Sequence, residues 1–447
     1  MKIPAKPPTF VEAMKALSDP ENVERFTKIV GSGVGPAPGG KYRHWDTIRH
    51  MIPPDDVSVD EWWAAIKFSR FQIRRLLALC DQKGKPFSYS TPDHVLQLLH
   101  EIDRDASGQI SVPEQITNPQ TKGKYLQSSL IEEAITSSQL EGAAATREQA
   151  KEMIRFGRKP SDRGERMILN NYQAMQLISR FKDQPLTPEL VFEIHQTITA
   201  GTLPADSLPP HLRQSGDGIA VYDDRDNALL HEPPSADEIP QRMEAMCEFA
   251  NQAKTDIFLH PVLKAIILHF WLAYDHPFID GNGRSARALF YWSMLSQGYW
   301  MVEFLSISSI LRKAPAKYSR SFLYAETDEN DLTYFVDAQL QVIRRAILEL
   351  HRYLTVKMEE IRKTEQLLRA SVELNHRQLA LLGHALRHPG TRYSIESHRM
   401  SHSVTYQTAR TDLLDLEAKG LLHKTRSGRA YAFTPVPDLY DRLQQLS

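Results

Sequence analysis

The sequence contains few cysteines and no apolar run long enough to cross a membrane. Its 447 residues include two cysteines, Cys80 and Cys247, which lie far apart. Two such residues imply neither a disulfide framework nor a cysteine-rich metal site, and they fit a reducing compartment. The most apolar run, residues 262–274, is too short for a bilayer and contains Lys264 and His269. The sequence therefore predicts no membrane insertion.

A signal sequence and a dominant charge are also lacking. The N-terminal residues MKIPAKPPTF have no apolar core of the kind that signal peptides carry, so we expect a cytoplasmic protein. The formal net charge of −1 provides no global attraction to nucleic acid or to membranes. Charge is nevertheless uneven, because residues 375–447 contain ten Lys or Arg, six Asp or Glu and six histidines. This last segment is mildly basic.

The remaining composition, 41% hydrophobic and 24% charged, is typical of a globular protein, and the length predicts about three domains. Apolar residues recur mostly at helical spacing, which predicts a mainly α fold. The Pro- and Gly-rich residues 1–40 predict an extended, partly mobile arm. Residues 41–120 are expected to be helical, including one helix through residues 59–80, in which Trp62 and Trp63 are core or interface anchors. Further helices are expected over residues 122–158, 166–200, 236–251, 261–274, 283–297 and 333–371.

Residues 103–114, DRDASGQISVPE, match the pattern of a calcium-binding loop. Asp103, Asp105, Ser107, Gly108 and Glu114 fill positions of that pattern. Pro113 falls where the helix after such a loop should be established, and no second loop of this kind occurs. We therefore favour a polar turn, and the sequence leaves calcium binding open as the alternative.

The most informative stretch is HPFIDGNGRSAR, residues 276–287, in which a loop is expected to open a helix. His276 is the side chain best suited to act as a base near neutral pH. Asp280 offers a carboxylate to a hard metal ion such as magnesium. Glycines let backbone amides approach an anion at a helix N-terminus, and arginines bind phosphate oxygens in bidentate fashion. This combination predicts a site that binds a nucleotide's phosphates and moves a proton beside them.

These residues resemble the signature of the Fic family, His-x-Phe-x-Asp/Glu-Gly-Asn-Gly-Arg-x-x-Arg, and every fixed position is met. The resemblance covers roughly residues 125–350. Ser285 and Ala286 replace the more common Thr and Gly of that family. The resemblance implies that His276 takes a proton from an attacking hydroxyl and that Asp280 holds Mg²⁺ between the α- and β-phosphates of ATP. The other roles that it implies are a core anchor for Phe278, an anion cradle for Gly281, Asn282 and Gly283, β-phosphate binding for Arg284 and γ-phosphate orientation for Arg287.

Fic proteins mostly transfer AMP from ATP to a hydroxyl side chain of a protein, so the resemblance implies a nucleotidyltransferase that modifies Ser, Thr or Tyr. Related toxin kinases carry Lys at the position of Gly283, which favours nucleotidyl over phosphoryl transfer here. Two alternatives stay open. One is a DNA-binding transcriptional regulator with a self-modifying or nucleotide-sensing Fic body, and the other is an enzyme that removes AMP.

An upstream hexapeptide, residues 137–142, matches the family's inhibitory pattern Ser/Thr-x-x-x-Glu-Gly/Asn through Ser137, Glu141 and Gly142. The resemblance implies that Glu141 pairs with Arg287 and occupies the place of the γ-phosphate, so that the protein inhibits itself. Glu141 would otherwise be a carboxylate at a helix end, with Gly142 as the stop. A further alternative is that Glu141 assists the reverse reaction, removal of AMP, by orienting a water molecule.

Residues 213–234 predict a small β-hairpin with a turn at DDRDN. The resemblance implies a flap over the site, whose exposed edge would accept a segment of the target protein by β-augmentation. A surface loop without a partner is the alternative.

Residues 375–436 predict three helices followed by a hairpin, which is typical of a winged helix-turn-helix. On the third helix, Ala409, Leu413 and Leu416 would pack inward, and Tyr406, Gln407, Arg410 and Thr411 would face a DNA major groove. Arg426 and Arg429 of the wing would contact phosphates. Dimerisation or protein binding by this segment is the alternative.

The chain is thus expected to be mainly α, with a Fic-type helical core, a β-hairpin flap, a helical N-terminal region and a C-terminal winged helix. The expected parts are residues 1–120, the catalytic domain 121–355 with an inhibitory helix at about 125–142, a helical linker 356–374 and the winged helix 375–447. Expected partners are ATP, Mg²⁺, a protein target or the chain itself, and DNA through residues 375–436. The sequence leaves a homodimer open.

Overall fold

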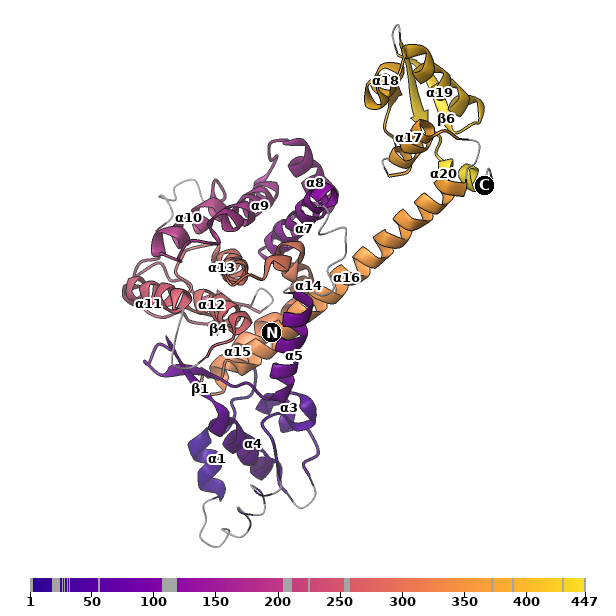
Figure 1. Ribbon diagram of the computed structural model, residues 1–447. Coiled ribbons are helices and arrows are strands. Elements are labelled where there is room, and N and C mark those ends of the chain that lie inside the picture. The colour runs from indigo at the N-terminus through magenta and orange to yellow at the C-terminus, as the bar shows by residue number, and fades with distance from the viewer. Residues whose placement is uncertain are drawn as a thin grey trace. The chain divides into compact units, whose positions relative to one another are not determined.

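The computed structural model divides the chain into two compact units, Met1–Leu350 and His351–Ser447. Most described residues are helical, which confirms the predicted fold class (Figure 1). The boundary between these two units lies inside the long helix of residues 333–370. The domain boundaries expected from the sequence, at residues 120, 355 and 374, therefore stay predictions. The described residues are 3–17, 25, 27, 29, 31, 33–54, 57–106, 119–203, 211–223, 226–252, 258–370, 374–387, 390–427 and 430–445.

The first unit is built from helices and two small antiparallel hairpins. Its helices are α1 (Phe10–Leu17), α3 (Trp45–Ile48), α4 (Val59–Ile73), α5 (Asp93–Ala106), α7 (Pro119–Leu140), α8 (Arg147–Phe156), α9 (Arg163–Phe181), α10 (Pro188–Thr199), α11 (Ile239–Asn251), α12 (Pro261–Asp275), α13 (Asn282–Ser296), α14 (Ile307–Lys313), α15 (Pro315–Thr327) and α16 (Thr333–Ala370), which continues past Leu350. Short 3₁₀ helices are η2 (Pro38–Gly40), η3 (Ala236–Glu238) and η4 (Trp300–Phe304). The hairpins pair β1 (Arg75–Cys80) with β2 (Pro86–Tyr89) and β3 (Val221–Tyr222) with β4 (Leu229–His231).

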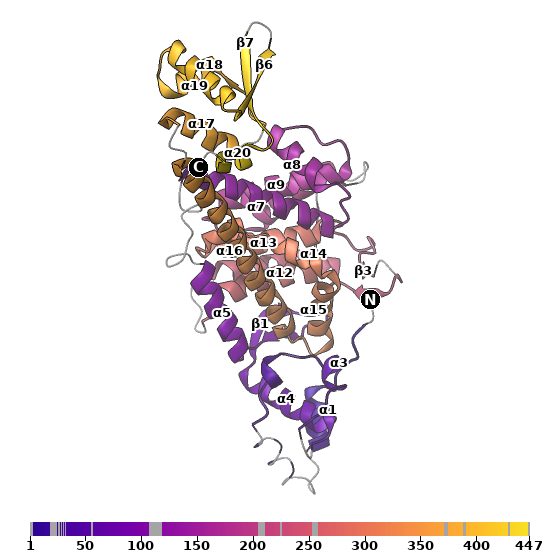
Figure 2. The same ribbon diagram turned by 90° about the vertical axis from the view of Figure 1, so that its right-hand side faces the viewer.

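Helices α12 and α13 form the centre of this unit. Every residue of α12 from Val262 to Leu272 is buried, as expected for a helix that is apolar on all sides. Helix α13 packs against α12, α7, α9 and α10, and α12 also packs against α11 (Figure 1, Figure 2). The link between α12 and α13 therefore lies inside a rigid helical frame, and it contains the predicted site.

The N-terminal region differs from the prediction in two places. The helix expected through residue 80 ends at Ile73, and the next residues form strand β1. Leu77 and Leu79 are buried while Leu76 is exposed, which is the period of a strand. Gly84 takes a φ of 73° in the turn between β1 and β2, and this turn lets residues 75–80 pair with β2 as a strand instead of extending the helix.

The prediction of an extended arm is wrong for residues 10–17, which form α1. Ala13 of α1 packs with Ala64 and Ala65 of α4, so an apolar face stabilises this helix. The backbone N–H of Phe10 also donates to Glu329 Oε2 at 2.8 Å. Burial of one face by α4 explains a helix that Pro- and Gly-rich neighbours did not suggest.

The predicted calcium loop lies mostly outside the described residues, which end at residue 106 in this region. Asp103 is part of α5, where its carboxylate accepts hydrogen bonds from the Tyr299 hydroxyl at 2.5 Å and from His260 Nε2 at 3.0 Å. In the part of the chain that the structure describes, no group of three His, Cys, Asp or Glu side chains is placed to hold a metal ion. Within the same residues, no helix combines the length and the apolarity needed to span a membrane.

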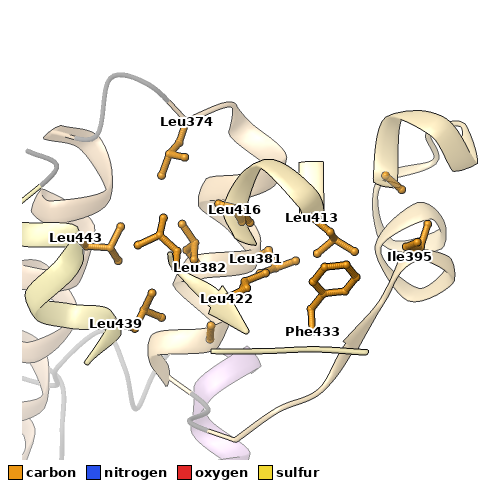
Figure 3. Packing of buried hydrophobic residues seen from close by; sticks show 13 residues of the cluster. Leu374, Leu381, Leu382, Ile395, Leu413, Leu416, Leu422, Phe433, Leu439 and Leu443 are labelled. Atoms are coloured by element: carbon orange, nitrogen blue, oxygen red, sulfur yellow. The ribbon is translucent and has the colours of Figure 1, made fainter. Parts of the chain in front are cut away.

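The second unit has three helices followed by a hairpin, in the order that the sequence predicts. Its elements are α17 (His376–Arg387), β5 (Tyr393–Ser394), α18 (Ile395–His402), α19 (Tyr406–Ala418), β6 (Leu422–Ser427), β7 (Ala430–Pro435) and α20 (Leu439–Gln445), and the strands form one antiparallel sheet in the order β5-β7-β6. Leu413 and Leu416 of α19 point into a core with Leu382 and Phe433 (Figure 3). The winged-helix interpretation stays a prediction. Arg429 of its wing lies outside the described residues.

Candidate active site

His276 lies directly after α12, where the backbone turns out of the helix. Its φ of 48° ends the helix in the left-handed region. The Arg213 side chain holds this turn, because its Nε donates to the His276 carbonyl at 2.8 Å and its Nη2 donates to the Asp275 carbonyl at 3.2 Å. The backbone of His276 is thereby fixed, while its imidazole makes one long contact, from Nδ1 to the Ala273 carbonyl at 3.3 Å.

Burial lowers the pKa of His276 to about 4. The charges of His231 and Arg213 act in the same direction, and the Ala273 carbonyl and Glu141 oppose them. The imidazole is therefore neutral at pH 7. If Nδ1 carries the proton toward the Ala273 carbonyl, which can only accept, then Nε2 is the free acceptor. His276 is in the protonation state that a general base requires.

The loop after His276 is closed by its own side chains. The Asn282 side chain accepts from the Phe278 backbone N–H at 2.9 Å and donates to the Phe278 carbonyl at 2.7 Å. The Phe278 ring is fully buried and stacks on His195, with ring centroids 3.6 Å apart. His195 Nε2 donates to the Asp280 carbonyl at 2.8 Å. These contacts fix the loop without using the predicted catalytic groups.

Gly281 precedes the first turn of α13 and has two reasons to be glycine. Its φ is 84°, and a Cβ there would lie 2.7 Å from Thr199 Cγ2. No side-chain cap covers the start of α13 at this position. The first amides of the helix therefore remain available to an anion, and the helix dipole favours negative charge there.

Asp280 lies beside this helix start with its side chain 36% exposed. Its carboxylate contacts Arg284 Nη2 at 3.4 Å and Arg163 Nη2 at 3.2 Å. Magnesium in nucleotide sites is held by one or two carboxylates together with substrate phosphates and water. A single accessible carboxylate next to an anion-binding helix end has the donor chemistry for that arrangement.

Arg284 is fully buried within the first turns of α13. Its Nη1 donates to the Ile198 carbonyl at 3.2 Å, whereas its Nε has no hydrogen-bond partner among the described residues. Burial, the largest effect, lowers the pKa of this guanidinium. A buried cation with an unused donor is costly unless an anion compensates it, so Arg284 is suited to bind a phosphate.

Arg287 contacts two of the three residues that the sequence places in the inhibitory pattern, Ser137 and Glu141. Its Nε donates to Ser137 Oγ at 2.9 Å, and its Nη2 donates to the Ser137 carbonyl at 3.0 Å and to Glu141 Oε1 at 2.9 Å. Burial, the largest single effect, lowers the pKa of Arg287, but the charge and hydrogen bond of Glu141 together with Tyr318 and Glu133 raise it, and the net shift is upward. Gly142 ends the segment with a φ of 86° and makes none of these contacts.

Glu141 also covers the start of α13. A Cβ at Gly283 would collide with Glu141 Oε1 and would lie 3.3 Å from Arg287 Nη1. The absence of a side chain at Gly283 is thus what allows the Glu141 carboxylate to sit against the helix. The structure brings His276, Asp280, Arg284 and Arg287 to one end of α13.

Three residues of this arrangement were not found from the sequence. Arg163 contacts Asp280, His195 supports Phe278, and Arg213 holds the His276 carbonyl. They come from α9, α10 and the segment before the flap. Since no fixed spacing links them to residues 276–287, the sequence carries no pattern that would have identified them.

The predicted hairpin is present as β3 and β4, with Val221 opposite His231 and Tyr222 opposite Leu229. Tyr222 and Leu229 are 48% and 46% exposed. His231 fastens the hairpin next to the end of α12, because its Nε2 donates to the Tyr274 carbonyl at 2.8 Å. Two residues of the predicted turn, 224 and 225, lie outside the described residues.

The geometry defines a helical protein with a candidate anion site at the link between the helices α12 and α13. Residues 185–294, which contain the whole link from α12 to α13, match the sequence model of the Fic/DOC family. The chain is therefore similar to this family through 110 of its 447 residues. The predicted inhibitory segment lies outside the matched residues.

Individual relatives agree with this assignment over short stretches. The chain is 29% identical over 118 residues to the protein adenylyltransferase Fic of Nematostella vectensis, which covers 26% of this chain and 25% of that protein. It is 36% identical over 69 residues to the protein adenylyltransferase Fic of Drosophila grimshawi, which covers 15% and 14%. The chain thus spans a quarter or less of these relatives. A crystal structure of a Fic family protein from Desulfovibrio desulfuricans G20 has a similar fold, with a TM-score of 0.52, 19% identity and coverage of 78% of this chain and 98% of that one.

Proposed function

We propose that the chain is a protein adenylyltransferase that transfers AMP from ATP to a Ser, Thr or Tyr hydroxyl of a protein. The observation that carries this proposal is the gathering of a neutral imidazole, a carboxylate and two buried guanidinium groups at the uncapped start of α13. The names of the relatives support the same reaction class.

In the proposed reaction, the hydroxyl oxygen bonds to the α-phosphorus, and the bond from that phosphorus to the oxygen leading to the β-phosphate breaks. Pyrophosphate leaves with the electron pair, and His276 takes the hydroxyl proton on Nε2. Arg284 and the first amides of α13 hold the β-phosphate and stabilise the charge on the leaving group. Mg²⁺ held by Asp280 would supply further charge neutralisation when bound. An exposed edge of the β3–β4 hairpin would position the target segment by β-augmentation.

Glu141 is proposed to inhibit this reaction. Its carboxylate accepts a hydrogen bond from Arg287 and lies against Gly283, where the γ-phosphate would otherwise bind. Two anions cannot share one buried guanidinium without a large electrostatic cost. ATP would therefore bind with its α-phosphorus misaligned until the Glu141–Arg287 pair opens.

The test compares α-labelled and γ-labelled ATP in the presence of Mg²⁺. We expect α-label on protein in the wild type, more in Glu141→Gly and none in His276→Ala. Protein label from γ-ATP alone would show a kinase. Label that appears and is then released as AMP by the wild type, but not by Glu141→Gly, would show that Glu141 serves the reverse reaction.

DNA binding by the second unit is a second candidate function. Tyr406, Gln407 and Arg410 are exposed along α19, as the groove-facing positions of a recognition helix would be. Fluorescence anisotropy with duplex DNA tests it, because phosphate contacts make the affinity fall with salt by a slope of about −0.9 for each contact. Arg410→Glu should weaken binding, while Arg352→Glu, at an exposed arginine of α16, should not. Equal effects of both would reject a recognition surface on α19.

A further inference from the structure

A cavity of about 400 Å³ lies between α14, α15 and α16, within the first unit. Figure 2 shows these three helices next to one another. Ile310, Leu311 and Val342 form much of its apolar lining. Its volume is within the range of small-molecule pockets, roughly 300–1,000 Å³. None of the groups proposed for AMP transfer lines it, so it is a separate candidate site.

The rim of this cavity is positively charged. Lys317, Arg344 and Arg345 line it, and none of the described lining residues carries a carboxylate. Arg344 forms an ion pair with Glu101 at 2.5 Å, and Arg345 makes a longer contact with Glu349, at 3.4 Å. Among the described residues, Lys317 contacts an amide oxygen at 3.3 Å and no acidic group. Cations therefore remain available to a ligand that carries negative charge.

Gln339 provides an independent observation within the same cavity. Its side chain lines the cavity and is 2% exposed. Its amide Nε2 has no hydrogen-bond partner among the described residues. A buried donor without an acceptor costs free energy.

We propose that this cavity binds a small organic anion with an apolar body and one carboxylate, and that its occupancy is transmitted to the Arg287–Glu141 pair through Tyr318. The apolar body would lie against Leu311 and Val342. The carboxylate would face Lys317. The coupling to the Arg287–Glu141 pair rests on the proposed function, whereas ligand binding in the cavity does not.

Tyr318 is the physical connection between the cavity and the candidate active site. It lines the cavity, and its hydroxyl lies 2.8 Å from Nε2 of the buried His269. Burial raises the pKa of Tyr318 to about 12, with Arg287 opposing the rise and Glu141 adding to it. His269 belongs to α12, which packs against α13, the helix that carries Arg287. The Tyr318 hydroxyl therefore contacts a helix that packs against the one bearing the ion pair's guanidinium. A ligand that moves the Tyr318 ring changes the surroundings of Arg287.

Calorimetric titration with 2-naphthoate tests the binding site in the full chain. We expect saturable 1:1 binding of 2-naphthoate and at least about tenfold weaker binding of the neutral 2-naphthalenemethanol. Lys317→Glu should weaken the binding of 2-naphthoate by a similar factor, because it replaces an attractive charge by a repulsive one. A tenfold loss of affinity corresponds to about 1.4 kcal/mol. Arg312→Glu changes a neighbouring exposed arginine that does not line the cavity, and it should leave the affinity unchanged. No binding, or equal binding of acid and alcohol, overturns the site.

The same titration tests the coupling without any AMP transfer. Because linkage is reciprocal, 2-naphthoate should bind Glu141→Gly and wild type with affinities that differ by about fivefold or more. Tyr318→Phe keeps the ring and removes the hydroxyl, so the difference should disappear when both proteins carry it. A persistent difference in the Tyr318→Phe background, or none in the wild-type background, overturns the connection. A change of sedimentation coefficient in Lys317→Glu without a change in affinity would show a protein interface instead and would also overturn the proposal.

Discussion

Removal of the Glu141 carboxylate should relieve the proposed inhibition of AMP transfer, and the geometry of the Glu141–Arg287 pair allows the size of the rate increase to be estimated. Glu141 Oε1 lies 2.9 Å from Arg287 Nη2, and the two side chains are 29% and 2% exposed. Two unit charges at this separation attract each other by about 6 kcal/mol at an effective dielectric constant of about 20, before any desolvation cost is counted. After desolvation and side-chain ordering, coupling between sites is typically about 1–3 kcal/mol, or roughly 5–150-fold. We expect the initial rate of AMP incorporation to rise by that factor in Glu141→Gly.

Two further variants separate charge from shape. Glu141→Gln keeps an oxygen that accepts from Arg287 but loses the charge, so its rate should fall between those of wild type and Glu141→Gly. Glu148→Gln changes an exposed glutamate in the first turn of α8 and should behave as wild type.

The assay is the initial rate of α-label incorporation at saturating ATP, with ATP affinity measured by calorimetry on the same proteins. Circular dichroism confirms that each variant is folded. A folded Glu141→Gly protein whose rate and ATP affinity equal those of wild type would refute an inhibitory role for this pair.

Three other predictions concern the end of α12 and the start of α13. His276→Ala should lower the rate of AMP transfer by about 10²–10⁴-fold, the usual contribution of a general base, with ATP affinity unchanged; a loss below tenfold would contradict the assignment. Because the pKa of His276 is lowered to about 4, the imidazole stays neutral at pH 5.5. The rate of AMP transfer at pH 5.5 should therefore equal that at pH 7.5. A fall in rate centred near pH 6.5 would point to a histidine with an unperturbed pKa. Gly283→Ala should displace the Glu141 carboxylate and should also stabilise helix α13 by up to about 1 kcal/mol. A crystal structure checks the displacement, and thermal unfolding checks the stability. An intact Glu141–Arg287 pair in that crystal structure would contradict the packing argument.

The sequence predicts the centre of the fold well because its patterns are local there. The apolar run predicts α12, and Gly281, with its φ of 84°, directly precedes the start of α13. The same holds for Leu413 and Leu416, whose spacing predicts the buried face of α19. In each case, the information lies within a few residues of the feature.

Prediction fails where structure depends on distant partners. The apolar residues of 75–80 suit a helix or a strand equally by composition, and pairing with β2 decides for the strand. Helix α1 exists because α4 covers it. The same limit applies to the site. Arg213 and His195 donate hydrogen bonds to backbone carbonyls of the loop. Because every residue type has a backbone carbonyl, no sequence motif predicts such contacts.

The most direct measurement is a crystal structure of Glu141→Gly with a nonhydrolysable ATP analogue and Mg²⁺. We expect the triphosphate over the first turn of α13, with its β-phosphate on Arg284, its γ-phosphate on Arg287 and its α-phosphorus facing His276 Nε2. A triphosphate bound elsewhere, or an α-phosphorus on the far side from the imidazole, would contradict it.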